Sequence, residues 1–208
     1  MAKHKVIVTG EFHTHQILWL HATLMNDLRI ENQNGHAYVD IEEALACSML
    51  LNIAFAIEAH ANYLLEAVCP SEYEDEKTFF SKGEYRGTLG KLCFLAKQLD
   101  VALDRGSRPF QTIKDLFKWR DLMVHSRIER QEDEIECIDP NQVSLPESQR
   151  INAYKASWAG RAFEDSQILC SSLQKAAYFD KKIKGILSAE AFSGFLGTRG
   201  TQIVSSEP

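Results

Sequence analysis

Apolar residues recur every three to four positions along most of this chain, which is the period of an amphipathic helix. No stretch shows the sustained alternation of apolar and polar residues that marks a half-buried strand. The pattern therefore predicts an all-α fold, a helical bundle of four to five helices. The expected helices span residues 41–68, 88–103, 109–127 and 148–183.

The helix expected at residues 41–68 is apolar around nearly its whole circumference, which is typical of a helix packed on several sides at the centre of a bundle. Asp40 is predicted as its N-cap, and Glu43 three residues later completes a capping box. Residues 41–185 are expected to form the bundle. Residues 1–40 are assigned to an N-terminal extension with a short strand at 6–8 and a helix at 13–25, and residues 186–208 to a polar tail.

The 208 residues carry a formal net charge of −6 and 45% of them are hydrophobic, as in an ordinary soluble globular domain. An acidic chain of this kind holds a polyanion only through a local basic patch. The most apolar stretch, ALACSMLLNIAFAI, is too short and too polar to span a bilayer, so no membrane association is expected. Five widely spaced cysteines without a C-x-x-C pair favour reduced thiols in a cytoplasmic protein over disulfides or a zinc site.

The segment KWRDLMVHSR, residues 118–127, places charged side chains on an otherwise apolar helix. Arg120 projects near the middle of the apolar stripe, where a guanidinium is costly unless another group uses it. Asp121 and His125 are four residues apart and share one edge of the helix. An imidazole that exchanges protons near neutrality, a cation that matches phosphate oxygens and a carboxylate that orients the ring together suit attack at a phosphodiester.

The sequence R-D-L-M-V-H, from Arg120 to His125, resembles the R-x-x-x-x-H motif of the HEPN superfamily (higher eukaryotes and prokaryotes nucleotide-binding domain), including the polar residue that this family prefers after the arginine. The order of the expected helices over residues 41–183 is also similar. The resemblance implies a homodimeric helical bundle whose two motifs face one another and which cleaves RNA without a metal ion or other cofactor. It further implies that Arg120 binds phosphate, His125 transfers protons and Asp121 supports His125.

Basic residues surround this motif in an otherwise acidic chain and are predicted to bind RNA phosphates. They are Lys114, Lys118, Arg127 and Arg130. On the central helix, Glu58 and Asn62 share a face from which they are expected to support the motif, and a structural hydrogen-bond network is the alternative for this pair. The HTH segment at residues 13–15, with His21, lacks the spacing of a zinc site, so no metal is assigned.

Two functions are compatible with these features. In the first, the protein is a metal-independent endoribonuclease of the toxin or defence-effector kind, which acts on RNA as a homodimer and has an antitoxin or another protein as partner. In the second, it is a non-catalytic HEPN-like module that binds a nucleotide or a protein. The second interpretation places Arg120 in a structural ion pair with a buried carboxylate such as Glu58, and makes the basic patch an ordinary solvated helix face.

Overall fold

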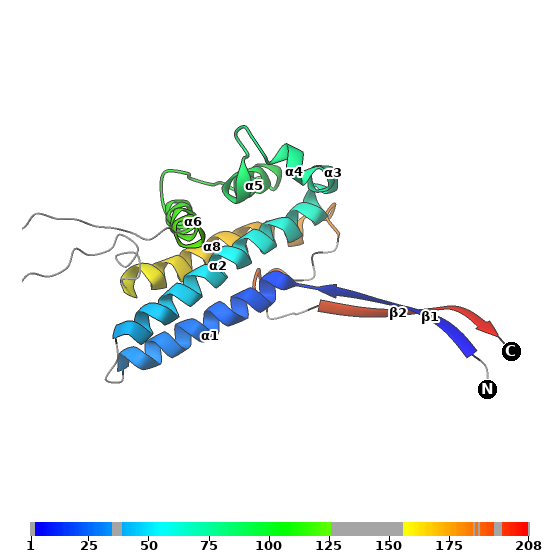
Figure 1. The fold of residues 1–208 in the computed structure, drawn as a ribbon. Helices are drawn as coiled ribbons and strands as arrows, with labels where there is room; N and C mark the ends of the chain where they lie inside the picture. Colours follow the sequence, from blue (N-terminus) through cyan, green and yellow to red (C-terminus); the bar gives the residue numbers. More distant parts are fainter. Residues whose placement is uncertain are drawn as a thin grey trace, which may run out of the picture.

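The computed structural model describes residues 3–34, 39–125, 156–184, 186, 188–193 and 197–207. The body of the molecule is helical, as the hydrophobic period predicts, and the two ends of the chain pair as strands (Figure 1). The helices are α1 (Thr14–Asn34), α2 (Val39–Val68), α3 (Pro70–Glu74), α4 (Glu76–Phe79), α5 (Gly87–Gln98), α6 (Phe110–Val124) and α8 (Ala156–Phe179). The strands are β1 (Lys3–Phe12) and β2 (Gly197–Glu207).

Helix α2 is the centre of the bundle. Helix α1 lies beside it along most of its length and runs in the opposite direction, while α8 packs against another side of α2 (Figure 1). Helix α6 crosses α2 and α8 steeply and contacts both, and α5 packs on α2 beyond α6. The all-round apolar character of residues 41–68 therefore corresponds to a helix that α1, α5, α6 and α8, as well as the short α3, contact.

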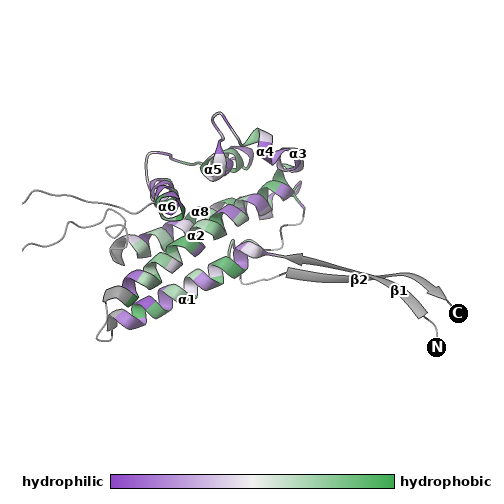
Figure 2. Cartoon of the chain, in the orientation of Figure 1, coloured by the Kyte–Doolittle hydropathy of each residue, from purple (hydrophilic) through white to green (hydrophobic). Residues whose placement is uncertain are grey.

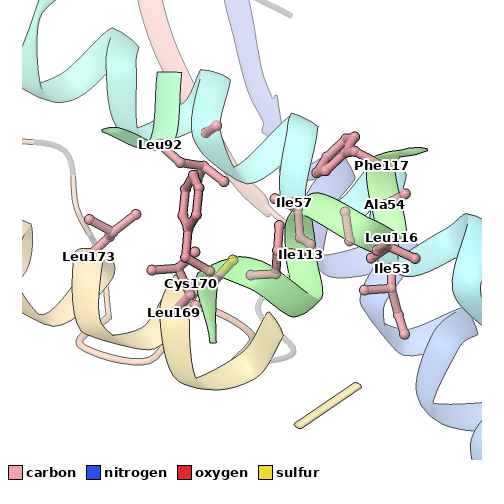
Figure 3. Close-up of a cluster of buried hydrophobic side chains, with 14 of the residues drawn as sticks. Ile53, Ala54, Ile57, Leu92, Ile113, Leu116, Phe117, Leu169, Cys170 and Leu173 are labelled. Carbon is pink, nitrogen blue, oxygen red and sulfur yellow. The ribbon is translucent and has the colours of Figure 1, made fainter. Parts of the chain in front are cut away.

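The core lies where α2, α5, α6 and α8 converge (Figure 3). Its largest fully buried side chains include Ile53 and Ile57 of α2, Leu92 of α5, Ile113 and Leu116 of α6, and Leu169 and Leu173 of α8. Within each helix these residues are three or four positions apart, so they share one face. Figure 2 shows hydrophobic and hydrophilic positions interspersed along the helices. Burial of each such side chain contributes about 1.5–3 kcal/mol.

Helix α1 belongs to this bundle, which differs from the division of the sequence at residue 40. Trp19 is 6% exposed, and its ring stacks on Phe163 of α8 at 4.6 Å between centroids and on Phe192 at 3.9 Å. Ala191, next to Phe192, is fully buried and accepts a hydrogen bond from Gln16 of α1. Segments assigned from the sequence to an extension and a tail thus meet in the folded core.

The ends of the chain form a two-stranded antiparallel ribbon that projects away from the bundle (Figure 1). Strand β1 pairs with β2 in a register that opposes Lys3 to Glu207 and Phe12 to Gly197, with one irregularity between Lys5 and Val6. The short strand predicted at residues 6–8 lies inside β1. The pairing partner comes from a segment almost the whole chain away, which the local pattern did not reveal.

Helix α5 ends at Gln98, before the predicted end at residue 103. Asp100 adopts the left-handed conformation with φ 54°, and the amide of Val101 donates to the carbonyl of Ala96 at 2.8 Å. This is the Schellman arrangement that closes a helix, made here by an aspartate instead of the usual glycine. The apolar Val101 and Leu103 still pack against the core, so the hydrophobic period continues after the helix has ended.

The other helix boundaries also move by a few residues. Helix α2 begins at Val39, so Asp40 lies in its first turn and is not the predicted N-cap. Helix α6 spans residues 110–124, with Pro109 at its N-cap position and His125 at its C-cap position. Helix α8 ends at Phe179 instead of residue 183. Residues 126–155, which include the predicted end of the third helix and the predicted start of the fourth, lie outside the described part of the chain.

By length and composition alone, residues Ile41–Val68 of α2 are apolar enough to cross a membrane. Half of the most apolar window of this helix is buried inside the bundle, and the central helix of a soluble bundle shares this composition.

Candidate active site

The motif residues lie at the C-terminal end of α6. The core-facing side of this helix carries Ile113, Leu116 and Phe117, and Arg120 continues that side one turn later. The Arg120 side chain is 21% exposed, so its guanidinium lies at the margin of the core and still reaches solvent. The position predicted for this arginine, in the middle of the apolar stripe, agrees with this placement.

Two carboxylates and an aromatic ring hold the Arg120 guanidinium. Its Nη1 donates to Oε2 of Glu58 on α2 at 3.0 Å, and its Nε and Nη2 donate to Oδ1 of Asp121 at 3.0 and 2.7 Å. The guanidinium carbon lies 4.9 Å from the centre of the Phe117 ring, a cation–π distance. Glu58 therefore supports the motif by direct contact with Arg120, as predicted. This contact is also the ion pair that is expected if Arg120 has only a structural role.

This arrangement uses only part of the donor capacity of Arg120. A guanidinium has five N–H groups, and the contacts with Glu58 and Asp121 use three of them. Among the contacts with described residues, one N–H on each terminal nitrogen has no acceptor. Two N–H groups on neighbouring nitrogens are the fork that binds two phosphate oxygens, so the arginine is both fixed in place and still able to bind an anion.

Asp121 does not support His125 in the predicted way. Its carboxylate binds Arg120, and its contact with His125 is through the backbone, where the His125 amide donates to the Asp121 carbonyl at 3.0 Å. The His125 side chain is exposed at the end of the helix, and its ring has no hydrogen-bond partner among the residues that the structure describes. A guanidinium at hydrogen-bond distance competes successfully for the carboxylate because it is always charged.

The basic patch predicted around the motif is divided by the helix geometry. Lys118 is exposed and pairs with Asp115 at 3.2 Å, and Lys114 is half-buried among residues that come from before α6. Because Lys114 precedes Arg120 by six residues, the two project about 120° apart around the helix. Arg127 and Arg130 lie outside the described residues. The two described lysines are therefore not gathered with Arg120 into one surface.

Asn62, the second residue predicted to support the motif, belongs to a separate contact. Its side-chain oxygen accepts a hydrogen bond from Nζ of Lys91 on α5 at 2.7 Å, and the same ammonium forms an ion pair with Glu76. The Lys91 side chain is only 6% exposed. Asn62 therefore fixes α5 against α2, which is the structural alternative for this position, while Glu58 one turn earlier serves Arg120.

A cluster of histidines was not predicted from the sequence. His15 from α1 and His60 from α2 have ring centres 5.4 Å apart, and His13 and Tyr63 complete the group, with His15 stacked on Tyr63 at 4.8 Å. His13, His15 and His60 are all buried. Among the described residues, no group of three or more His, Cys, Asp or Glu is arranged to hold a metal ion. The HTH segment was noted in the sequence, but only the pairing of α1 with α2 brings it to His60.

Two glutamines fix the hydrogen bonding of this cluster. Gln16 donates from Nε2 to Nε2 of His15 at 3.1 Å, and Gln174 accepts at Oε1 from Nε2 of His60 at 3.0 Å. Burial lowers the pKa of His15 to about 3, and repulsion from His60 and His13 adds to the effect. Burial also lowers the pKa of His60 to about 4, although the hydrogen bond with Gln174 acts in the opposite direction. Both rings are neutral at physiological pH and act as polar members of the core.

Comparison of the chain with protein-family models, with curated proteins and with solved structures gives no match.

Proposed function

We propose that the protein is a metal-independent endoribonuclease of the HEPN type that acts as a homodimer. The observation that carries the proposal is the placement of Arg120. Its guanidinium is held by Glu58 and Asp121 at the edge of the core and remains partly exposed, and its contacts with the described residues leave one N–H on each terminal nitrogen. The helical fold is compatible with this assignment. The R-D-L-M-V-H order of residues 120–125 supplies the histidine that the chemistry needs.

The proposed reaction is an intramolecular transfer at an RNA phosphodiester. The neutral imidazole of His125 removes the proton of the 2′-hydroxyl, and the 2′-oxygen attacks phosphorus. The bond to the 5′-oxygen breaks, and the leaving oxygen takes a proton from an imidazolium or from water. The products are a 2′,3′-cyclic phosphate and a 5′-hydroxyl, and Arg120 stabilises the negative charge that gathers on the phosphoryl oxygens.

A second protomer completes the site in this proposal. On a single α6, Arg120 and His125 project about 140° apart, so one helix does not direct both at the same phosphate. Each has a large exposed aliphatic neighbour on its own side, Val124 at 55% for Arg120 and Leu122 at 51% for His125. Exposed aliphatic side chains beside a polar site favour a protein contact there. A two-fold axis near the end of α6 would bring the Arg120 of one protomer toward the His125 of its partner.

The second candidate is a non-catalytic module, and one observation favours it. Asp121 binds Arg120 through Oδ1, and none of the described side chains forms a hydrogen bond with the imidazole of His125. A general base without an orienting partner is less effective. In this alternative the ion pair between Arg120 and Glu58 only joins α6 to α2, and the surface around it binds a nucleotide or a protein.

Cleavage of single-stranded RNA by matched variants distinguishes the two functions. We expect His125→Ala and Arg120→Ala each to reduce the rate by about 100-fold or more, because a general base and a positioned phosphate donor each contribute at least that much. His21→Ala, which removes an exposed histidine of α1, is the control and should leave the rate unchanged. Chelation of divalent cations should have no effect, and the products should end in a cyclic phosphate.

The variant Glu58→Gln separates the two roles of Arg120. If the arginine serves chemistry, this variant keeps measurable cleavage, because Asp121 still holds the guanidinium. Absence of cleavage by the unmodified protein under all ionic conditions would favour the binding module. If Arg120→Ala and Glu58→Gln destabilise the fold equally and neither changes cleavage, the arginine is structural. Sedimentation that shows only monomer at micromolar concentration would exclude the composite site.

A further inference from the structure

A pocket of about 230 Å³ lies beside α6, on a different side of this helix from Arg120. It is formed by the N-terminal half of α5, the first turns of α6 and the loops that precede each helix. Its charged walls are Glu84, Arg86, Arg105 and Lys114. Of these residues only Lys114 was assigned a function from the sequence. Three cations and one carboxylate give this pocket a net charge of about +2 in a protein that is acidic overall.

The loop before α5 is folded tightly to make this wall. Gly83 and Gly87 have φ of 79° and 66°, and Gly90 in the first turns of α5 lies directly against the backbone of Tyr85. A Cβ at residue 90 would lie 1.9 Å from the carbonyl carbon of Tyr85, so only glycine permits this approach. This contact fixes Tyr85 against α5. Its two neighbours in the chain, Glu84 and Arg86, are thereby held at the wall of the pocket.

The cations of the pocket are available to a ligand. Within the described part of the molecule, neither Arg86 nor Lys114 uses its side chain in an ion pair or a hydrogen bond, and Lys114 is half-buried. Arg105 has one weak partner, Glu84, at 3.9 Å, and both side chains of that pair are more than half exposed. Exposed pairs of this length contribute little, so an anion that approaches Arg105 competes easily with Glu84.

The chemistry of these walls selects one kind of ligand. Two guanidinium groups and an ammonium match the oxygens of a phosphate, and each would form a charge-assisted hydrogen bond with it. A terminal phosphate carries close to two negative charges at neutral pH, whereas a phosphodiester carries one, so the net charge of the pocket is better matched by the terminal group. The volume lies below the roughly 300–1,000 Å³ of pockets that enclose a whole drug-sized ligand. It therefore fits one phosphate and the first atoms of the group that carries it.

We propose that the pocket lined by Arg86, Arg105 and Lys114 binds a terminal phosphate monoester, either of a small phosphorylated metabolite or of the 5′-phosphorylated end of a nucleic acid. The assignment does not depend on the ribonuclease activity proposed above. Lys114 and Arg120 project to different sides of α6, so a phosphate in this pocket does not occupy the motif.

The test measures binding to the full-length protein by isothermal titration calorimetry, with probes chosen to avoid cleavage. The probes are inorganic phosphate, ribose 5-phosphate, and a short oligodeoxynucleotide with either a 5′-phosphate or a 5′-hydroxyl, which lacks the 2′-hydroxyl that the proposed cleavage needs. We expect at least one monoester probe to bind, and the 5′-hydroxyl oligonucleotide to bind about tenfold or more weakly than its phosphorylated form. Tighter binding of ribose 5-phosphate would identify a small phosphorylated metabolite as the ligand, and tighter binding of the phosphorylated oligonucleotide would identify a nucleic acid end.

Matched variants locate the binding. Lys114→Gln should weaken monoester binding by about tenfold, while Lys175→Gln, which removes an exposed lysine of α8, should not change it. Glu84→Gln should strengthen binding, because it removes the one carboxylate of the pocket; a general loss of folding would not give this increase. The proposal is overturned if no monoester binds, or if Lys114→Gln and Lys175→Gln weaken binding equally, which would indicate only non-specific attraction of anions.

Discussion

Acid should unfold this protein through its buried histidines. His15 and His60 are neutral in the fold, and their hydrogen bonds leave no place for a second proton. Nε2 of His15 accepts from Gln16, and Nδ1 of His60 is buried without a hydrogen-bond partner among the described residues. A second proton on His15 would face the amide donor of Gln16, and one on His60 would be buried without an acceptor among the described residues. Burial therefore holds both pKa values below 6.5, at about 3 and about 4.

The sign and size of the effect follow from these values. Above about pH 6.5 the two histidines are neutral in both the folded and the unfolded chain and do not change stability. Below that pH the two histidines bind protons in the unfolded chain but not in the folded protein. The free energy of unfolding therefore falls as the pH falls toward 4. Each proton corresponds to about 1.4 kcal/mol per pH unit, so about 5 kcal/mol is lost between pH 6.5 and 4.5. This is comparable with the whole stability of many domains, about 5–15 kcal/mol.

Urea unfolding at several pH values measures this loss. Circular dichroism follows helix content. Tryptophan fluorescence follows packing, and one of its three contributors, Trp19, lies close to the cluster because its ring stacks on Phe192, which also neighbours His60. The free energy of unfolding should fall between pH 6 and 4.5 with a slope of nearly two protons. His60→Gln should remove about one proton from that slope, and His21→Gln, an exposed control on α1, should not change it.

A slope of less than half a proton, or an unchanged slope in His60→Gln, would contradict the assignment of this loss of stability to the buried histidines. Either result would mean that the histidines take up protons in the fold, with the surrounding structure opening to water. Carboxylates of the unfolded chain also begin to bind protons below about pH 5.5, so the histidine contribution is the difference in slope between the unmodified protein and His60→Gln.

Three substitutions test other parts of the fold by the same unfolding measurement. Gly90→Ala should destabilise by about 1–3 kcal/mol or more, since the new methyl group overlaps the backbone of Tyr85; an unchanged midpoint would show that the loop moves freely. Asp165→Asn should lower the free energy of unfolding by about 1–2 kcal/mol, because this buried carboxylate accepts hydrogen bonds from Nε and Nη2 of the half-exposed Arg108 at 2.8 and 2.9 Å, and a loss confined to acid pH would contradict this. Trp19→Ala should lower the free energy of unfolding by about 3–5 kcal/mol, because Trp19 joins α1 to the bundle. A decrease below about 1 kcal/mol would support an independent extension.

The hydrophobic period of the sequence determined the helical body of this protein. A period of three to four residues is a property of one local segment, so it identified the central helix, the helix that carries Arg120 and the side of that helix on which the arginine lies. It was less informative at helix ends. The end of α5 depends on the left-handed Asp100, a conformation that the residue type only weakly indicates.

Tertiary structure decided which side chains meet. The Asp121 carboxylate binds Arg120 through Oδ1, and it forms no hydrogen bond with the ring of His125 among the described residues. Lys114 lies with Arg86 and Arg105 instead of with the motif, and His15 reaches His60, because helices that are distant in sequence pack side by side. These contacts join residues whose separation along the chain carries no periodic signal. The sequence could supply the chemical groups, and only the packing of the helices could arrange them.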